Sequence, residues 1–520
     1  MSENELEQSV TAVKPNGEGT GISRLNVLRQ APTPEALKLL PEDLAIKYKT
    51  VPLSVENSIL RVAMADPDDI LALEALSAHT KKKIEAIAAG EKDIREAIDF
   101  NYKAFGSMSK YLNSIEASKR KDDVEMLKAG AADDSPVAQV LTMIVDEAIK
   151  SRASDIHIEP DEKKLRIRYR IDGILHDVIS LPIGVMLPLT SRIKILSNMN
   201  IADRLRPQDG QFTITAKGKN VDIRVAIINT IYGEMSVLRL LDKALGSMTL
   251  AQLGLLPDSQ EKMEKMLTAP YGMILISGPT GSGKTTTLYA SVNSLDRVGN
   301  NIITIEDPVE YRFENINQIQ VNAKGGVTFA SGLRAIVRLD PDIILVGEIR
   351  DKETAEIAIQ SALTGHMVLS SVHANDTINV VFRLMDLGIE PFLINSGVIG
   401  VVAQRMVRRI CPYCAAPVTA PLVERMVYEQ VTGEQQTEFM YGAGCKACTY
   451  TGYLGRTGIF EILTMTDAIR QLLIDKAPAS KIRELAINEN LISMAKDGML
   501  KVKKGLTTPY EVLRNIHIND

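Results

Sequence analysis

The sequence predicts a multidomain α/β protein built around a P-loop nucleotide-binding core, on three observations. The chain has 520 residues, which is more than one hydrophobic core usually holds. A glycine-rich loop lies between an apolar strand and a helical stretch, which is the context of a phosphate-binding loop. Several short apolar strands are separated by helical stretches and end in polar residues, as in a parallel sheet that is covered on both faces.

Composition places the chain among folded soluble proteins and limits its partners. Hydrophobic residues make up 45% and charged residues 24%, near the averages for globular domains. The formal net charge of −5 provides no overall positive field, so we expect no nucleic-acid partner. No apolar run approaches the roughly 18 residues of a spanning helix, and the acidic start Met1–Ser9 is unlike a signal peptide. We therefore expect a cytoplasmic protein that reaches a membrane only through partners.

The first part of the chain divides into a tail, a small domain and a linker. Residues 1–21 are rich in Glu, Ser, Gly and Thr without an apolar period, which predicts a disordered tail. Residues 22–105 contain short helical and strand-like stretches punctuated by prolines, which predicts a compact α/β adaptor domain. Residues 106–134 carry few bulky apolar side chains and several adjacent charges, as in a linker.

An α+β domain is predicted over 135–245. Ser135 followed by proline is a helix start signal, and apolar residues then recur at helical spacing. Leu165–Ile171 alternates apolar residues with arginines and ends at Asp172-Gly173, the pattern of a half-buried strand before a hairpin turn. Further strands are expected at Val221–Val225 and Val237–Leu241.

The predicted core, residues 250–408, opens with a helix over Gln260–Leu267 and a phosphate-binding loop. The run Gly278–Thr285 fits the pattern GxxxxGK[ST] between the apolar strand Met273–Ser277 and the helical run Thr285–Leu295. Glycines let backbone N–H groups approach a phosphate chain, the lysine reaches the outer phosphates, and the next hydroxyl holds Mg²⁺. The alternative is a glycine-rich turn with an incidental lysine. The candidate ATP-binding residues are Gly278, Pro279, Thr280, Gly281, Ser282, Gly283, Lys284, Thr285 and Thr286, with Thr285 also at Mg²⁺.

Three more apolar strands end in polar residues. Ile302–Ile305 runs into Glu306–Glu310, Ile343–Val346 into Gly347-Glu348, and Met367–Val372 into His373. The carboxyl ends of parallel strands meet at one edge of a sheet, so these groups converge with the P-loop into a nucleoside triphosphatase site. Glu348 suits the Mg²⁺ side of this site and Glu310 the attacking water. Either carboxylate could instead be a helix cap or a surface anion, and which glutamate is the general base stays open.

Histidines and arginines add further candidates. His366 and His373 lie on either side of one predicted strand, and a histidine at the strand end could contact the γ-phosphate. Arg334 and Arg338 are four residues apart on one predicted helix face, and arginines placed near the phosphates accelerate phosphoryl transfer. Arg224 and Arg239, in strands of the preceding domain, are candidates for the same role. The alternatives are a core or surface histidine and solvated arginines.

The four cysteines form two CxxC pairs, Cys411/Cys414 and Cys445/Cys448, which predict one structural Zn²⁺ site. Four thiolates leave no open metal position for catalysis, so the metal would staple a module over 409–455 that has no large core of its own. A helical region is expected over 456–520. A thioredoxin-like redox pair is the alternative.

Three arginines just before the first cysteine, Arg405, Arg408 and Arg409, could contact nucleic acid. Such a group is more often a solvated or protein-contacting face.

Together these motifs resemble those of the secretion ATPase superfamily, which includes the type II secretion and type IV pilus assembly ATPases and, more distantly, retraction and conjugation ATPases. The resemblance runs from about Ser151 to the C-terminus. The segments that carry it are Arg152–Pro160 and Arg168–Gly173 for the N2 domain, Gly278–Thr285 for Walker A, Ile305–Glu310 for the Asp box, Asp342–Glu348 for Walker B and Thr364–His373 for the His box.

The resemblance implies a homohexameric ATPase with a RecA-like core behind an N2 domain, using ATP, Mg²⁺ and Zn²⁺. It also implies Glu310 as the catalytic carboxylate, Glu348 near Mg²⁺, and arginines around the phosphates at Arg224, Arg239, Arg334 and Arg338. The implied function is ATP hydrolysis that drives pseudopilus assembly and protein export through inner-membrane platform proteins. Type IV pilus assembly is the alternative. The cysteine pattern is similar to that of the assembly and secretion members rather than the retraction members.

Two other functions compete with this one. A DNA-uptake or DNA-transfer motor is disfavoured by the net charge of −5 and by the absence of a basic aromatic groove. A zinc-containing scaffold that binds ATP without turnover would show no steady phosphate release.

Two segments depart from the family pattern. Ser371–Ala374 stands where the family often has Thr-Leu-His-Thr. In the first domain, Leu39–Pro41, Val51–Leu53 and Val62–Pro67 resemble the platform-docking domain. However, Arg24–Asn26 lacks the Arg-Leu-Gly start of members that bind cyclic di-GMP, so the resemblance does not extend to that ligand.

Overall fold

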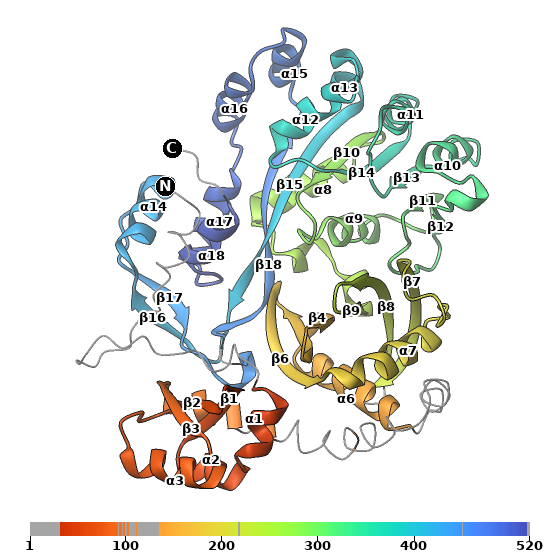
Figure 1. Cartoon of the computed structure of the whole chain (residues 1–520). Coiled ribbons are helices and arrows are strands. Elements are labelled where there is room, and N and C mark those ends of the chain that lie inside the picture. Colours follow the sequence, from red (N-terminus) through yellow and green to blue (C-terminus); the bar gives the residue numbers. More distant parts are fainter. Residues whose placement is uncertain are drawn as a thin grey trace. The chain divides into compact units, whose positions relative to one another are not determined.

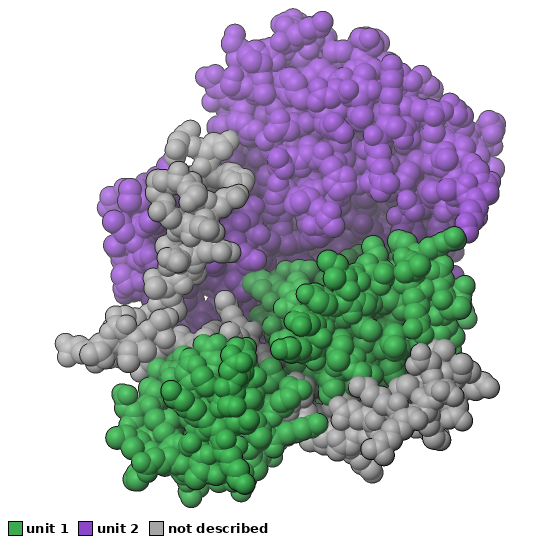
Figure 2. Space-filling model, viewed as in Figure 1, with its two compact units in different colours: residues 1–240 green, residues 241–520 purple. Residues whose placement is uncertain are grey.

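The computed structural model describes residues 32–91, 93–95, 97–98, 101–102, 111, 135–216, 219–449 and 451–516. The predicted tail over 1–21, the segment Arg24–Asn26 and almost all of the predicted linker over 106–134 lie outside these residues. The chain forms two compact units, Met1–Leu240 and Leu241–Asp520, which are coloured separately in Figure 2. Each unit is described by itself.

The first unit begins with a small sheet of order β1-β2-β3, in which β2 pairs antiparallel with β1 and parallel with β3. Thr33 caps the first helix, since its hydroxyl accepts from the Ala36 N–H. The elements of this part are α1 (Pro34–Leu39), α2 (Glu42–Lys47), β1 (Thr50–Glu56), β2 (Ile59–Met64), α3 (Ile70–Thr80) and β3 (Lys83–Ala88). The structure therefore contains the α/β arrangement expected for the adaptor domain.

The first unit also contains a larger antiparallel sheet of order β6-β5-β4-β9-β8-β7 (Figure 1). Ser135 caps the helix that precedes it, as the sequence predicts, and apolar side chains of this helix are buried. The elements are α6 (Pro136–Lys150), β4 (Ala153–Pro160), β5 (Lys164–Ile171), β6 (Ile174–Pro182), α7 (Met186–Leu196), β7 (Gln208–Ala216), β8 (Lys219–Thr230) and β9 (Gly233–Leu241).

The second unit is organised around a seven-stranded sheet of order β12-β11-β13-β14-β10-β15-β18. All neighbours pair in parallel except β15 and β18, which pair antiparallel from Gly400 to Ile410. The strands are β10 (Gly272–Ser277), β11 (Ile302–Glu306), β12 (Asn317–Gln320), β13 (Ile343–Val346), β14 (Met367–Val372), β15 (Val398–Ile410) and β18 (Tyr453–Thr464).

Helices cover both faces of this sheet, as Figure 1 shows. Alternate residues of β10 enter different cores: Met273 and Leu275 pack with the core that contains α11, α12 and α15, whereas Ile274 and Ile276 pack with the core that contains α8 and α9. The helices are α8 (Pro257–Leu267), α9 (Lys284–Asn293), α10 (Phe329–Ile336), α11 (Lys352–Leu363), α12 (Thr377–Asp386), α13 (Pro391–Gly397), α15 (Asp467–Ile474), α16 (Ala479–Asn488), α17 (Met494–Lys503) and α18 (Pro509–Asn515).

The segment between β15 and β18 is an insertion that carries the four cysteines. It forms a two-stranded antiparallel ribbon of β16 (Ala415–Thr419) and β17 (Glu438–Gly442), joined by α14 (Leu422–Thr432). Short 3₁₀ helices lie here and elsewhere in the described residues, at Ile183–Val185, Lys243–Ser247, Leu250–Leu253, Ala323–Gly325 and Lys446–Cys448.

Strand positions were predicted well, but the end of the chain was not. The bounds of β13 and β14 are those expected from their apolar runs, and β10 and β11 differ by one residue. The expected helical region over 456–520 instead begins with most of β18. β18 pairs with β15 and becomes the last strand of the sheet. Because the cysteine insertion separates the two strands in the sequence, this pairing could not be inferred from local sequence.

Candidate functional site

The glycine-rich loop joins β10 to α9 in the geometry of a phosphate-binding loop. Gly278, Gly281 and Gly283 have φ of 148°, 78° and 90°, which residues with a Cβ rarely adopt. A Cβ on Gly278 would lie 2.5 Å from the carbonyl oxygen of Gln404, so the chain approaches its neighbour too closely for any other residue. Gly283 is the N-cap of α9, whose first residue is Lys284.

Lys284 lies over the loop that precedes it. Its ammonium donates to the carbonyl oxygens of Gly278 at 2.9 Å and Pro279 at 3.1 Å. Burial lowers the pKa of Lys284, the Glu348 carboxylate opposes that shift, and Arg405 adds to it. A partly desolvated ammonium at a helix N-terminus favours an anionic ligand, because the anion replaces lost hydration.

The ends of the parallel strands meet around this loop, as the sequence predicts. Ser277, the last residue of β10, pairs in register with Val372 of β14 on one side and with Ala403 of β15 on the other. The following residues, His373 and Gln404, therefore flank the glycine-rich loop. We call Gly278–Lys284, Glu306–Glu310, Gly347–Arg350 and His373–Asn375 together the nucleotide edge.

Side chains at the strand ends fasten these segments to one another. The Ser277 hydroxyl donates to the Ala374 carbonyl at 2.9 Å and accepts from the Ala374 N–H at 3.1 Å. The Ser371 hydroxyl donates to the Gly347 carbonyl at 2.8 Å, and the Gly347 N–H donates to the Ile305 carbonyl at 2.8 Å. Ser371 belongs to the segment Ser371–Ala374, whose sequence differs from the family motif. In this structure its hydroxyl fastens the end of β14 to Gly347 of the nucleotide edge.

Glu348 and His373 come together at this edge. Nε2 of His373 lies 3.8 Å from a carboxylate oxygen of Glu348, and the other oxygen is 2.5 Å from the guanidinium of Arg350. Burial lowers the pKa of His373 and the positive charge of Lys284 lowers it further, whereas the Glu348 carboxylate opposes this shift. Arg350, which sequence reasoning did not single out, is the cationic partner of Glu348.

The acidic segment after β11 contains two glutamates in different surroundings. Glu306 is 3% exposed, and its carboxylate accepts from Thr304 at 2.7 Å, from Gln318 at 3.2 Å and from the Tyr289 hydroxyl. Glu310 is half-buried, and its backbone N–H donates to the Tyr289 hydroxyl at 3.3 Å. Only Glu310 of this pair is placed to meet a solvent-accessible reactant.

The two histidines that flank β14 are separated by the strand. His366 precedes β14, at the opposite end from the P-loop, and its Nδ1 lies 2.8 Å from the Ser361 carbonyl and 3.3 Å from the Thr364 hydroxyl. The structure thus places His373 at the nucleotide edge and His366 at the end of α11.

The arginine candidates are dispersed. Arg334 lies on α10 and forms an ion pair with Glu353 of α11, and both side chains are more than half exposed. Arg338 comes after the end of α10 at Ile336, so the expected shared helix face does not form. Glu353 lies in the first turn of α11, three residues after Arg350 of the nucleotide edge, so Arg334 lies beside that edge. Arg338 lies on the path from α10 to the start of β13, at the opposite end of that strand.

Arg224 and Arg239 lie in the first unit, on β8 and β9. The Nε of Arg239 is 3.0 Å from a carboxylate oxygen of the buried Asp155. Their contribution to a nucleotide site stays a prediction.

Gln404 is a supporting residue that the sequence analysis missed. It is 1% exposed, its amide N–H donates to the Ser282 carbonyl at 2.7 Å, and its amide oxygen accepts from the Thr287 hydroxyl at 2.8 Å. It thereby joins β15 to both the loop and α9. The available signal was one amide residue at the end of the apolar run Val398–Ala403.

The donor set fits the predicted ligands ATP and Mg²⁺. The Ser282 hydroxyl is buried in the loop without a hydrogen-bond partner, and a Cβ on Gly281 would meet nothing within 4 Å. Backbone N–H groups, a lysine and the Thr285 hydroxyl are the groups that P-loops present to a phosphate chain and its Mg²⁺.

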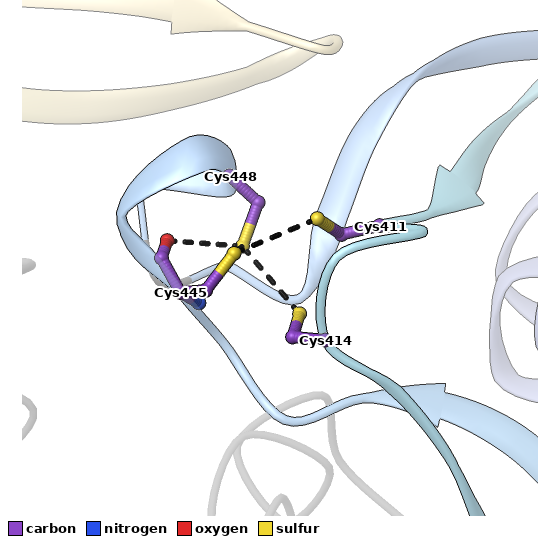
Figure 3. Close-up of side chains that lie close together, drawn as sticks. All are labelled: Cys411, Cys414, Cys445 and Cys448. Carbon is purple, nitrogen blue, oxygen red and sulfur yellow. Dashed lines mark hydrogen bonds between the residues drawn. The ribbon is translucent and has the colours of Figure 1, made fainter.

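The four cysteine thiols converge on one point (Figure 3). Their Sγ atoms lie within 4.8 Å of one another, with separations of 3.7 Å for Cys411–Cys445, 3.9 Å for Cys414–Cys448 and 3.8 Å for Cys445–Cys448. Zn–S bonds of about 2.3 Å in a tetrahedron place sulfurs about 3.8 Å apart, so the thiols fit Zn²⁺. Cys411 follows β15 directly, whereas Cys445 is the N-cap and Cys448 the last residue of a short 3₁₀ helix.

The zinc module, residues 409–455, packs against a core that it shares with the rest of the second unit. Tyr428 of α14 and Phe439 of β17 are buried with ring centroids 4.9 Å apart. They belong to one core cluster with Val407 of β15 and Met499 of α17. Most buried residues of this cluster lie outside 409–455, on β15, β18 and the C-terminal helices, so the module has no large core of its own, as expected.

Two of the three arginines before the module have partners within the chain. Arg408 forms an ion pair with the buried Glu511 at 2.5 Å and lies 3.9 Å from the ring centroid of Tyr453. Arg405 is half-buried and donates to the Asn375 carbonyl at 3.3 Å. These contacts favour the protein-contacting interpretation over the nucleic-acid one. Among the described residues, none of the helices has both the length and the apolar character of a membrane span.

Comparisons with protein families agree with the motifs. A model described as type II/IV secretion system protein matches residues 130–514, and a model of the MshEN domain matches residues 20–107.

Comparisons with individual proteins identify relatives along most of the chain. The type IV pilus assembly ATPase PilB of Myxococcus xanthus is 40% identical over 503 residues, which is 95% of this chain and 89% of that protein. The type II secretion system protein E of Pseudomonas aeruginosa is 42% identical over 440 residues, 83% of this chain and 87% of that protein. The X-ray structure of the Legionella pneumophila ATPase DotB has a similar fold, with a TM-score of 0.54 at 18% identity, covering 72% of this chain and 94% of that one.

Proposed function

The chain belongs to the family of type II/IV secretion system proteins, and we propose that it works as a homohexameric ATPase that drives pseudopilus assembly for protein export in type II secretion. It is an ATPase, as are the relatives in its family. The single observation that supports the proposal most is the nucleotide edge, where the P-loop, Glu348 and His373 meet within a chain that matches this family over residues 130–514.

Each group at the nucleotide edge has a proposed role in hydrolysis. Lys284 and the backbone N–H groups of the P-loop bind the phosphates, and Thr285 and Glu348 hold Mg²⁺, which neutralises charge on the phosphates. Glu310 orients the attacking water. His373, which lies 3.8 Å from Glu348, would contact the terminal phosphate.

Arginines would complete the site in the assembled ring. Arg224 and Arg239 lie outside the P-loop unit, so they would reach phosphates only through domain or subunit apposition. Arg334 and Arg338 are candidates for contact with phosphates across a subunit boundary. Arginines supplied in this way can accelerate phosphoryl transfer by about 10³–10⁵. His366 has no role in this proposal, because it contacts the end of α11.

The cellular setting follows from the family. We propose a cytoplasmic ring that contacts inner-membrane platform proteins and no nucleic acid, and that reaches the membrane through those partners alone. The zinc module and the MshEN domain are the proposed contact regions, because neither supplies a residue to the nucleotide edge.

Type IV pilus assembly is a second candidate, and one observation favours it. The pilus assembly relative covers 95% of this chain, whereas the type II secretion relative covers 83%. The sequences of the segments Glu310-Tyr311 and Leu387–Leu393 favour type II secretion over pilus assembly. Both systems assemble a pilus-like filament from an inner-membrane platform, so the proposed mechanism is the same.

Two variants test the ATPase mechanism. Lys284→Ala is expected to weaken both nucleotide binding and turnover. Glu310→Gln is expected to bind Mg-ATP normally and to hydrolyse it at least ~10²-fold more slowly, the scale of lost general-base positioning. Normal phosphate release by Glu310→Gln would transfer the base role to Glu348.

The cellular role is tested with the Glu310→Gln allele on the chromosome of the strain that encodes the chain. Loss of protein export with normal surface pili supports secretion. Loss of pili with normal export assigns the chain to pilus assembly, and an unchanged strain would reject both.

A further inference from the structure

Tyr289 links the phosphate side of the nucleotide edge to its water side. It lies on α9, the helix that begins with Lys284, and its side chain is 1% exposed. Its hydroxyl donates to the carboxylate of Glu306 and accepts from the backbone N–H of Glu310 at 3.3 Å. One hydroxyl therefore fixes the backbone of the proposed water-orienting residue to the helix that holds the phosphate-binding lysine.

A second side chain holds the other end of the same loop. Gln318 of β12 donates from its amide nitrogen to the Tyr311 carbonyl at 2.9 Å and accepts the Phe313 N–H at 2.9 Å. The same amide nitrogen donates to Glu306 at 3.2 Å. The loop from Glu306 to Phe313 is thus held on both sides of Glu310, and both contacts meet at the Glu306 carboxylate.

Glu306 is the centre of this arrangement although it is almost inaccessible. Its hydrogen-bond donors, Tyr289, Thr304 and Gln318, are all neutral side chains. Burying a carboxylate is costly unless its oxygens are hydrogen-bonded, so three donors in fixed geometry are needed to keep it there. Burial raises the pKa of Tyr289 far above its ordinary value and Glu306 raises it further, so the hydroxyl keeps its proton and stays a donor.

Aromatic packing restricts the ring that carries this hydroxyl. The Tyr289 ring packs edge-on against Tyr311 at 6.0 Å and against Phe313 at 4.8 Å between ring centroids. Both partners follow Glu310 in the same loop. Replacing tyrosine by phenylalanine would keep these contacts and remove only the hydroxyl.

We infer that Tyr289 and Glu306 are positioning residues for hydrolysis: they hold Glu310 at a fixed place relative to the P-loop without touching the nucleotide. This inference rests on the proposed role of Glu310. Its energetic basis is that effective general-base action requires the base within hydrogen-bond reach of the water, and a loop that is free to shift holds that geometry for a smaller share of the time.

A matched pair of variants separates positioning from stability. Tyr289→Phe removes the hydroxyl at the nucleotide edge. Tyr441→Phe removes a hydroxyl that donates to another buried glutamate, Glu424, in the zinc module. Both lose a tyrosine–carboxylate hydrogen bond, so both are expected to lower thermal stability by a similar amount.

Only Tyr289→Phe is expected to slow hydrolysis. Its kcat should fall about 5- to 10-fold, the equivalent of one hydrogen bond, while the dissociation constant for Mg-ATP stays within about 2-fold of wild type. Tyr441→Phe should leave kcat unchanged. Both are measured on the full-length protein by steady phosphate release and by binding of a fluorescent ATP analogue, together with Glu310→Gln on the same day.

The outcomes distinguish this inference from the function on which it rests. A normal kcat in Tyr289→Phe beside a slow Glu310→Gln overturns the positioning role and leaves the proposed function standing. Equal losses of kcat in Tyr289→Phe and Tyr441→Phe would also overturn it, because stability alone would then explain the effect. A normal kcat in Glu310→Gln would instead reject the water-orienting role of that residue. Glu306→Gln is a second variant, expected to lower kcat at unchanged nucleotide affinity.

Discussion

The nucleotide edge and the zinc module belong to the same unit but are held in place by different means. At the nucleotide edge, the backbone does most of the positioning: neighbouring parallel strands end in register, and serine hydroxyls fasten each following loop to the next. In the zinc module, two loops more than thirty residues apart contribute the thiols, as the pairs Cys411/Cys445 and Cys414/Cys448 show. The sheet positions the residues of the first site, whereas one metal ion bound by all four thiols would hold the residues of the second.

This difference predicts whether a single substitution at each site should affect catalysis or folding. Because the sheet edge rests on many backbone hydrogen bonds, single side chains there should alter chemistry more than folding. Because one Zn²⁺ would hold the four cysteines together, loss of one ligand should alter local folding more than chemistry. The following predictions test that contrast, from the largest expected effect to the smallest.

Removing a zinc ligand should give the largest structural effect. Cys445→Ser is expected to lower bound zinc from about one per chain to none and to remove about 10 kcal/mol of metal-linked stabilisation from the module. Hydrolysis should stay within about 3-fold, since none of the four cysteines belongs to the nucleotide edge. Metal analysis, amide exchange of residues 409–455 and phosphate release check this. A loss of turnover greater than tenfold would contradict the prediction that the cysteines affect folding more than hydrolysis. A Cys411–Cys414 disulfide without zinc would support the redox alternative.

Breaking the buried ion pair beside the module should cost less. Arg408→Met removes the nearer cationic partner of Glu511, whose side chain is 1% exposed, and leaves Arg514 at 3.3 Å, so it is expected to destabilise the protein by about 1.5–3 kcal/mol. Burial raises the pKa of Glu511, but its contacts with Arg408 outweigh burial and hold the pKa below the ordinary value of 4.5. A depressed carboxylate pKa gives stability that is present above the unfolded pKa and is lost as pH falls through the folded one.

The difference in unfolding free energy between wild type and Arg408→Met should therefore be full at pH 7 and shrink below about pH 4.5. Urea unfolding at both pH values measures it. A difference that persists unchanged at low pH would mean that the arginine acts through its packing on Tyr453 rather than through its charge.

Removing the amide of Gln404 should act on the nucleotide edge alone. Gln404→Leu removes the hydrogen-bond partner of the Ser282 carbonyl and of the Thr287 hydroxyl. A cost of about 1–3 kcal/mol, if expressed fully in nucleotide binding, corresponds to a loss of roughly 5- to 150-fold in ATP affinity. Zinc content should not change. Gln471→Leu, on the exposed side of α15, is the control. Equal ATP affinity in both variants would show that β15 does not support the P-loop through this side chain.

The smallest effect is expected at the exposed pair of Arg334 and Glu353. Glu353→Gln should change the free energy of unfolding by at most about 1 kcal/mol, because both side chains are more than half exposed. This variant frees Arg334, so higher ring-dependent turnover in it would support a role for Arg334 across a subunit boundary. A loss of several kcal/mol would show that the pair is structural.

The sequence predicted the parts of this site that local patterns determine. Apolar runs defined β13 and β14, and the P-loop, Glu348 and His373 followed from what lies at strand ends. What it missed depends on distant contacts. The burial of Glu306 requires Tyr289 from another element, and the pairing of β18 with β15 spans the whole zinc module. The pairing of Arg334 with Glu353 likewise cannot be inferred from the spacing of Arg334 and Arg338.

One strand, β15, links the two sites, and its length determines how far a movement at one site would displace the other. β15 contacts the P-loop through Gln404 and ends where Cys411 begins the zinc cluster, seven residues later. At about 3.3 Å per residue, this span is roughly 23 Å, so a tilt of about 5° at one end displaces the other by about 2 Å. Antiparallel pairing with β18 stiffens the span into a ribbon. A displacement of the glycine-rich loop would therefore be carried along this one strand to the loop that begins with Cys411.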